Sequence, residues 1–470
     1  GLGLAGLAQA APPWIWDADQ DGIDDRIVDV ETQGLAAAFE NQDPVNGRQL
    51  FDVTESAGTF TYGLFVKYAY PPQEADDLAL QAVGLTTKRY LYINYIRTRA
   101  TAAQIPQILA LPGVVRVETM PYMYSTNDNA VQTMQAGPSN YERFPSASAD
   151  LSLTGHGVVV AILDSGVNDQ ADSLGTYPGH ESLAGKFVGG GIFDLGQPET
   201  STGLNESMNP FDGDPQFSHG SHVAGSAIGN GGPGGFYRGI APDAQMVDCK
   251  VLTDAGTGLG SADGLEWGIY NKNRDWGLTG ADSVYKGIQV VNMSLGGSSA
   301  SDGTDANSAA VNAAVKAGLV VCVASGNDGN TAYMPSPAAA DLAVTVGATV
   351  DVNTLRRNDD VIASFSNEGP RDPDSDSDSF DEMKPNVCAP GGGITSVEGA
   401  RTANGHTYTT TNGTSMSCPM VAGVAALLVQ ACPGIDPLEV RRILQDTADH
   451  RVTGGKQGAG AVDPFGLDPN

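Results

Sequence analysis

Near-continuous apolar runs that alternate with helix-like segments dominate the chain beyond residue 155. Their lengths and spacing predict strands at 158–163, 246–252, 288–293, 319–324 and 342–346, and helices at 219–228, 262–272 and 307–317. Strands buried on both faces require such apolar runs, and alternation with helices is typical of a parallel sheet. The sequence therefore predicts an α/β fold, a parallel sheet flanked by helices. In such sheets functional groups gather where strands end and helices begin.

One of these junctions carries a candidate nucleophile, Ser415. It lies in the stretch Asn-Gly-Thr-Ser-Met-Ser-Cys-Pro-Met-Val-Ala-Gly, directly before the apolar segment 424–431, and is expected at the entrance of a buried helix. The N–H groups of a first helical turn have no partner within the helix, so an anion formed beside Ser415 would be stabilised there. A serine hydroxyl is a weak nucleophile at neutral pH, and it needs a base and a group that orients the base.

Two other junctions supply candidates for these roles. Asp164 ends the first apolar strand in Ala-Ile-Leu-Asp-Ser-Gly, and His219 opens the helical segment His-Gly-Ser-His-Val-Ala-Gly. Each residue alone has an ordinary structural explanation, because Asp164 and Ser415 could cap helices and a single His is more often packed in a core. Their joint occurrence favours a Ser-His-Asp site. We interpret His222 as a packed helix residue rather than a second base.

The three motifs together resemble those of the subtilisin-like serine proteases, in that family's order Asp, His, Ser, over about residues 157–463. The resemblance implies that Ser415 attacks the scissile carbonyl, His219 takes and returns the proton, and Asp164 holds the imidazole. It also implies that Asn327, in Val-Ala-Ser-Gly-Asn-Asp-Gly, binds the developing oxyanion together with the Ser415 backbone N–H. A simple turn residue is the alternative for Asn327.

The same resemblance implies two strands that bind an extended peptide by β-addition. They are Ser294, Leu295 and Gly296 in one segment and Gly256, Thr257 and Gly258 in the other. A glycine-rich loop alone also fits many turns. The sequence departs from the family pattern at Ser218, Ser221 and Ser417, where Gly, Thr and Ala are usual. It also has an inserted Asp/Ser-rich loop at 372–381, interpreted as a solvated excursion, with a calcium site as the alternative.

A smaller unit precedes the predicted peptidase domain. Alternating patterns predict strands at 62–68, 90–98 and 114–118 and helices at 74–83 and 102–111, which together make a small α+β unit. By position it resembles the family's propeptide, an intramolecular chaperone and inhibitor, with self-cleavage expected between about residues 122 and 129. The expected domains are a leader at 1–49, the propeptide at 50–126 and a subtilisin-like peptidase domain at 127–470.

The leader contains an acidic loop with carboxylates at alternating positions. Asp17, Asp19, Asp21 and Asp25 surround Gly22, an arrangement that wraps oxygens around a hard cation, and calcium is the natural candidate. Val28 stands where an EF-hand has its bidentate Glu. A solvated acidic linker is the alternative. Calcium would be structural, because the expected chemistry requires no cofactor.

Charge and composition restrict the partners. The chain has 55 acidic and 25 basic residues and a formal charge of −30, which disfavours nucleic acid and anionic membranes. Its sequence shows no apolar run of about 18 residues. The acidity suits a secreted or salt-adapted protein, and residues 1–10 are either the tail of a secretory signal or a flexible leader. A monomer acting on protein or peptide substrates is expected. The five cysteines allow at most two disulfides.

Two other classes of function are weaker. A glycine-rich α/β nucleotide-binding protein would need a phosphate loop with a Lys after a strand, and the sequence lacks one. A calcium-dependent structural or adhesion protein with an inactive protease domain would need a broken triad. Asp164, His219, Ser415 and Asn327 are all present in their motifs, which favours an enzyme.

Overall fold

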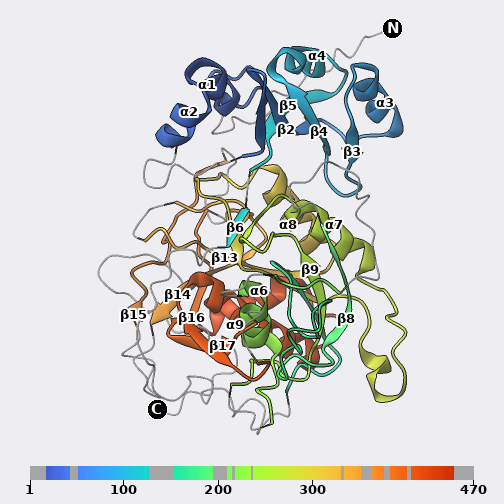
Figure 1. The fold of residues 1–470 in the computed structure, drawn as a ribbon, viewed down its shortest axis with the longest axis vertical. Helices are drawn as coiled ribbons and strands as arrows, with labels where there is room; N and C mark the ends of the chain where they lie inside the picture. Colours follow the sequence, from blue (N-terminus) through green and yellow to red (C-terminus); the bar gives the residue numbers. More distant parts are fainter. Residues whose placement is uncertain are drawn as a thin grey trace. The chain divides into compact units, whose positions relative to one another are not determined.

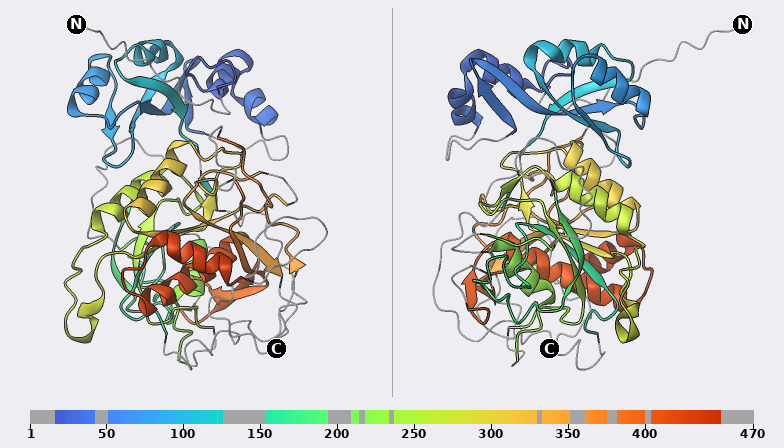
Figure 2. Two further views of the ribbon diagram at one scale, coloured as in Figure 1. Left: turned by 180° about the vertical axis from the view of Figure 1, so that it is seen from behind. Right: turned by 45° about the vertical axis from the view of Figure 1, so that its right-hand side comes forward.

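The computed structural model describes residues 17–42, 51–121, 123–125, 153–193, 209–213, 218–233, 237–329, 333–350, 361–374, 382–399 and 404–448. The chain divides into two compact units. The N-terminal unit comprises residues 1–120 with 373–379, and the C-terminal unit comprises residues 121–372 with 380–470. Figures 1 and 2 show the elements of each unit in three views.

The N-terminal unit is built on an antiparallel sheet in the order β1-β2-β4-β3, with β5 also paired to β2. The strands are β1 (Val53–Ser56), β2 (Thr59–Tyr68), β3 (Thr87–Arg89), β4 (Tyr95–Thr101) and β5 (Val114–Thr119). Its helices include α3 (Glu74–Ala82) and α4 (Ile105–Leu109), the latter after the 3₁₀ turn η1 (Ala102–Gln104). The strands and helices predicted between 62 and 118 are therefore present, apart from shifts at their ends.

Two helices that were not predicted from the sequence complete this unit. They are α1 (Asp25–Gln33) and α2 (Leu35–Gln42). Ile27, Val30 and Phe39 from these helices share one apolar core with Phe51 and Tyr62 from the sheet region. The segment expected to be a separate leader thus packs as part of the α+β unit, and the contacts divide the chain after residue 120 rather than after 126.

The C-terminal unit is organised by an eight-stranded sheet. Its order is β15-β14-β13-β11-β7-β9-β8, with β16 paired to β14, and all its neighbours are parallel except β14 and β15. The strands are β7 (Val159–Asp164), β8 (Phe187–Ile192), β9 (Gln245–Lys250), β11 (Val290–Met293), β13 (Val320–Ala324), β14 (Val344–Val350), β15 (Val361–Ile362) and β16 (Val387–Gly392). All five strands predicted from apolar runs lie in this sheet.

Helices cover both faces of the sheet because alternate strand residues point to opposite faces. On one face, Val160 and Ile162 of β7 share a core with α6 (His219–Ile228) and α9 (Thr414–Ala431). On the other, Leu163 lies against Gly264 of α7 (Ser261–Asn271), which packs with α8 (Ala306–Lys316). The 3₁₀ turn η3 (Gly280–Val284), the hairpin β17 (Ile394–Val397) and β18 (Tyr408–Thr411), and α10 (Pro437–Asp446) complete the named elements apart from three short strands.

The central helix α9 is long and apolar because it is a core element. By length and hydropathy alone it could cross a bilayer, with a mean hydropathy of 1.4 over 18 residues, yet 89% of that stretch is buried. It packs against α6 and against β11, β13, β14 and β16. The predicted buried helix at 424–431 is its second half.

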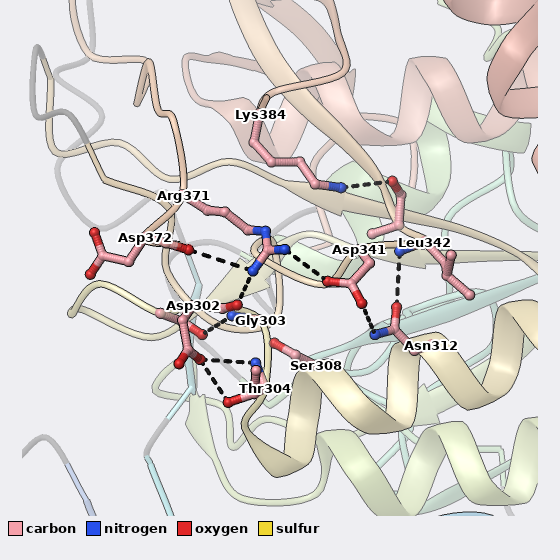
Figure 3. Close-up of polar contacts among 12 residues, drawn as sticks. Asp302, Gly303, Thr304, Ser308, Asn312, Asp341, Leu342, Arg371, Asp372 and Lys384 are labelled. Carbon is pink, nitrogen blue, oxygen red and sulfur yellow. Dashed lines mark hydrogen bonds and ion pairs between the residues drawn. The ribbon is translucent and has the colours of Figure 1, made fainter. Parts of the chain in front are cut away.

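A buried arginine connects the segments around the start of α8 (Figure 3). Arg371 is 2% exposed, and its guanidinium lies 3.2 Å from Asp341 Oδ1 and donates to the Asp302 carbonyl oxygen. Asn312 of α8 donates to the other Asp341 oxygen at 3.3 Å and accepts from Leu342 N at 2.9 Å. Arg371 thereby fixes the chain just before the predicted inserted loop, most of which lies outside the described residues.

Candidate active site

A buried carboxylate and imidazole meet where β7 ends and α6 begins. Asp164, the last residue of β7, is fully buried, and its Oδ1 lies 2.7 Å from Nδ1 of His219, the first residue of α6. A carboxylate only accepts here, so the hydrogen is on Nδ1, and a neutral ring then presents Nε2 as an acceptor. The predicted Asp-His pair is formed, in the tautomer that a general base requires.

The turn after Asp164 fixes the positions of Asp164 and His219 relative to each other. Asp164 Oδ1 also accepts from Ser165 N at 2.7 Å, and the Ser165 hydroxyl accepts from Gly220 N at 3.0 Å while donating to Asp212. Gly220 is required by the close approach, because a Cβ there would stand 2.3 Å from the Gly166 carbonyl oxygen. Ser165 and Gly220 were quoted in the motifs, but their contact joins residues distant in sequence and was not predicted.

A second buried carboxylate, Asp248 in β9, supports the same turn from the neighbouring strand. It is fully buried, and its Oδ2 accepts from Val167 N at 2.8 Å. Burial raises the pKa of Asp248 well above its ordinary value, and the nearby Asp169 adds to this shift. Asp248 was not predicted as a site residue, because it lies inside a run expected only as an apolar strand.

Ser415 is the second residue of α9 and fully buried, so the predicted position at a helix entrance is confirmed. Its hydroxyl donates to the Ser294 carbonyl oxygen at 3.3 Å, and its own carbonyl oxygen accepts from the Ser294 hydroxyl at 2.9 Å. Asn292 donates to Ser294 Oγ at 3.0 Å. Because α6 and α9 pack together, His219 and Ser415 open neighbouring helices.

Asn327 follows β13 and contacts the residue before Ser415. Its Oδ1 accepts from Thr414 N at 2.8 Å and from Thr414 Oγ1 at 3.0 Å, while Thr414 Oγ1 accepts from Gly326 N at 3.2 Å. These bonds fix the orientation of the amide. Its Nδ2 is buried without a hydrogen-bond partner. An oriented amide N–H without a partner beside a helix N-terminus is suited to bind an anion. Thr414 was not predicted as a site residue.

The two predicted peptide-binding segments lie on either side of a strand from the same chain. Residues 257–258 form β10 (Thr257–Gly258) and residues 295–296 form β12 (Leu295–Gly296), and both pair antiparallel with β6 (Met123–Ser125). Ser125 pairs with Leu295 and Tyr124 with both Thr257 and Gly296. A Cβ at Gly258 would stand 2.0 Å from the Val251 carbonyl oxygen. The strands β10 and β12 thus hold the extended backbone of β6 between their edges.

The remaining residues singled out from the sequence have these positions. His222 is buried, its Nε2 donates to the Thr409 carbonyl oxygen at 3.2 Å, and burial lowers its pKa to about 3, as suits a packed neutral residue. The five cysteines form no disulfide, and all but the exposed Cys432 are buried. In the acidic loop, oxygens of Asp17, Asp19 and Asp21 lie within 4.8 Å of one another, whereas Asp25 Oδ2 accepts from Ala18 N at 2.8 Å.

The fold and the site together define a class, the α/β serine hydrolases that pair a buried Asp-His couple with a serine at a helix entrance. Comparison with known proteins identifies the family within this class. Residues 155–466 match the model of the subtilase family, Peptidase S8. The chain belongs to the subtilase family, a family of serine endopeptidases.

The similarity extends along most of the chain. It is 34% identical over 315 residues to the serine protease AprX of Bacillus subtilis (strain 168), covering 63% of this chain and 62% of AprX. It is 33% identical over 392 residues to M-protease of Shouchella clausii (strain KSM-K16), covering 82% of this chain and 84% of the relative. The crystal structure of fervidolysin from Fervidobacterium pennivorans, described as a keratinolytic enzyme related to subtilisin, shares the fold. Its TM-score is 0.62 at 22% identity, over 89% of this chain and 62% of fervidolysin. The predicted α/β subtilisin-like fold is therefore confirmed.

Proposed function

We propose that this subtilase is an active endopeptidase in which Ser415 is the nucleophile, His219 the base and Asp164 the group that orients the base. The 2.7 Å contact between Asp164 and His219 Nδ1 carries the proposal, because it leaves the imidazole as a base near the entrance of α9. Ser415 Oγ attacks the peptide carbonyl carbon as its proton passes to His219. The leaving amine takes that proton, and water then hydrolyses the acyl-enzyme.

The developing oxyanion is stabilised by Asn327 Nδ2 and the backbone N–H of Ser415. Support comes from the two hydrogen bonds that Thr414 donates to Asn327 Oδ1, because they fix the orientation of the amide. The Nδ2 of the same amide is buried and has no hydrogen-bond partner. A donor fixed before the reaction does not have to reorganise when charge develops, which is the source of its catalytic value.

Protein substrates bind as an extended strand between β10 and β12. Support comes from β6, whose extended backbone pairs with both strands. Backbone hydrogen bonds contribute affinity that depends little on substrate sequence, while side-chain pockets add specificity. Synthetic peptides long enough to pair with both strands should therefore have a higher kcat/KM than shorter ones with the same residue at the cleaved bond.

The chain is made as a zymogen that cleaves itself after β6. Ser125 pairs with Leu295, and the adjacent Ser294 carbonyl accepts the hydroxyl of Ser415. At about 3.3 Å per residue, the bond cleaved is expected within about two residues after Ser125. This falls in the expected 122–129 window, of which only 123–125 are among the described residues. The 1–120 unit would then act as propeptide, chaperone and inhibitor.

Expression of the full-length Ser415→Ala chain tests self-processing. Wild-type protein should yield a fragment that begins shortly after Ser125, while Ser415→Ala remains intact by mass spectrometry. Ser417→Ala is the matched control, because Ser417 is an equally buried serine in the same helix. Processing of Ser415→Ala in a host that lacks other secreted proteases would refute self-cleavage. A processing rate independent of protein concentration would identify the intramolecular reaction.

Labelling with a serine-directed phosphonate tests the nucleophile separately. The mass of one phosphonyl group should appear on the peptide that contains Ser415 in wild-type and Ser417→Ala protein, and the His219→Ala variant should label far more slowly. Absence of labelling in a folded wild-type chain would favour an inactive structural protein.

A secreted monomer is the accompanying proposal. The formal charge of −30 supports it, since charge of one sign opposes self-association and suits solubility outside the cell. Fractionation of the producing culture and light scattering of the Ser415→Ala chain test these two points.

A further inference from the structure

The loop that precedes α1 brings three carboxylates together. One oxygen each of Asp17, Asp19 and Asp21 lies within 4.8 Å of the other two. Backbone N–H groups of the loop hold these side chains: Gly22 N donates to Asp17 Oδ2 at 3.1 Å and Ile23 N to Asp21 Oδ1 at 2.8 Å. The loop is thus folded around its own acidic groups.

Asp17 gives an observation that does not depend on the clustering. The residue is only 9% exposed, and its Oδ1 is buried without a hydrogen-bond partner. A buried carboxylate oxygen without a donor is unfavourable, and two more carboxylates beside it add like-charge repulsion. A cation bound between these oxygens would remove both penalties.

We propose that this loop is a calcium site with Asp17, Asp19 and Asp21 as its carboxylate ligands. The donors are all oxygen, which suits a hard cation, and their spacing is that of calcium loops with carboxylates at the first, third and fifth positions. Ile23 holds the seventh position, which in such loops supplies a backbone carbonyl. Asp25 acts differently from the sequence-based expectation, because its Oδ2 closes the loop on Ala18 N.

The site is built into the edge of the N-terminal unit. Val117 N in β5 donates to the Gly22 carbonyl oxygen at 2.8 Å, and Asp24 N donates back to the Val117 carbonyl oxygen at 3.1 Å. The fully buried Asp24 side chain accepts from Thr119 N at 2.8 Å. Calcium would hold the loop closed and keep this segment on β5, so the ion would stabilise the N-terminal unit rather than take part in peptide hydrolysis.

Calorimetric titration of calcium into the chelator-treated, full-length Ser415→Ala chain tests the site, since this variant separates metal binding from proteolysis. Asp19→Asn changes an exposed side chain, so the variant should fold. It should weaken one calcium-binding event at least tenfold, and Asp17→Asn should abolish it. Glu55→Gln, which removes an exposed charge from β1 of the same unit, should bind as the parent does.

Hydrogen exchange measured by mass spectrometry provides a second readout. Calcium should slow exchange in peptides covering β5 in the parent and in Glu55→Gln, and have at least tenfold less effect in Asp19→Asn. Identical calcium stoichiometry, affinity and β5 protection in the parent and both Asp variants would overturn the proposal. Equally tight binding of magnesium at the site would overturn the assignment to calcium.

Discussion

Replacement of Asn327 separates the two functions that the structure gives to one amide. Its Oδ1 accepts two hydrogen bonds from Thr414, which support the start of α9, and its Nδ2 is the candidate oxyanion donor. Asn327→Leu removes both functions. Loss of one oxyanion donor in a member of this family lowers kcat about 10²- to 10³-fold, or about 2.7–4 kcal/mol of transition-state stabilisation.

The structural cost of the same substitution is smaller. Thr414 N and Oγ1 lose their acceptor in Asn327→Leu, and an unsatisfied buried donor costs about 1–3 kcal/mol of the free energy of unfolding. Asn327→Asp keeps the acceptor and removes only the Nδ2 donor. This variant should therefore unfold near the wild-type denaturant midpoint, yet lose at least as much kcat as Asn327→Leu, since a carboxylate would repel the oxyanion.

The assay is kcat and KM on a chromogenic peptide, with active sites counted by phosphonate titration so that folded fractions are compared. Thr414→Ser is the matched control, because it retains the hydroxyl that orients Asn327, and it should stay within about threefold of wild type, well below the loss of one donor. A folded Asn327→Leu or Asn327→Asp enzyme with kcat within that range would refute the oxyanion role.

Three further predictions concern stability and reactivity. Gly220→Ala should lower the free energy of unfolding by about 1–3 kcal/mol and reduce kcat, because its Cβ would clash with the Gly166 carbonyl beside the Asp-His pair. Gly268→Ala is the control, because a Cβ at Gly268 would have its nearest neighbour at 3.9 Å. This variant should keep the wild-type stability in thermal melts and the wild-type kcat. Burial lowers the pKa of His222 from 6.5 to about 3, so the unfolded chain takes up the proton first. Its contribution to stability is complete above about pH 6.5 and is lost as pH falls toward 3. The free energy of unfolding of Ser415→Ala, measured with urea, should depend less steeply on pH in this range when His222→Gln is added. An unchanged slope of this free energy against pH would contradict the argument. One thiol, the exposed Cys432, should react with Ellman's reagent in the native chain and all five in denaturant. More than one fast thiol in the folded chain would count against the buried positions.

The sequence by itself determined the class of fold and the candidates for the reacting groups. The sheet strands are buried on both faces, so their apolar runs could be read without knowing their neighbours, and every strand expected between 158 and 346 was found. The triad candidates lie in short local motifs at strand and helix ends. His219 and Ser415 accordingly open α6 and α9 as expected.

Only the tertiary structure decided how these groups are supported. Thr414 orients Asn327 across a separation of 87 residues, and Asp248 holds the turn after Asp164 from a neighbouring strand. Likewise, α1 and α2 belong to the N-terminal core because their apolar faces find the sheet, and Asp25 closes the acidic loop instead of joining its carboxylates. Periodicity and motifs record what a residue does within its own segment. Hydrogen bonds and packing between distant segments depend on strand order and register, which form only when the whole chain has folded.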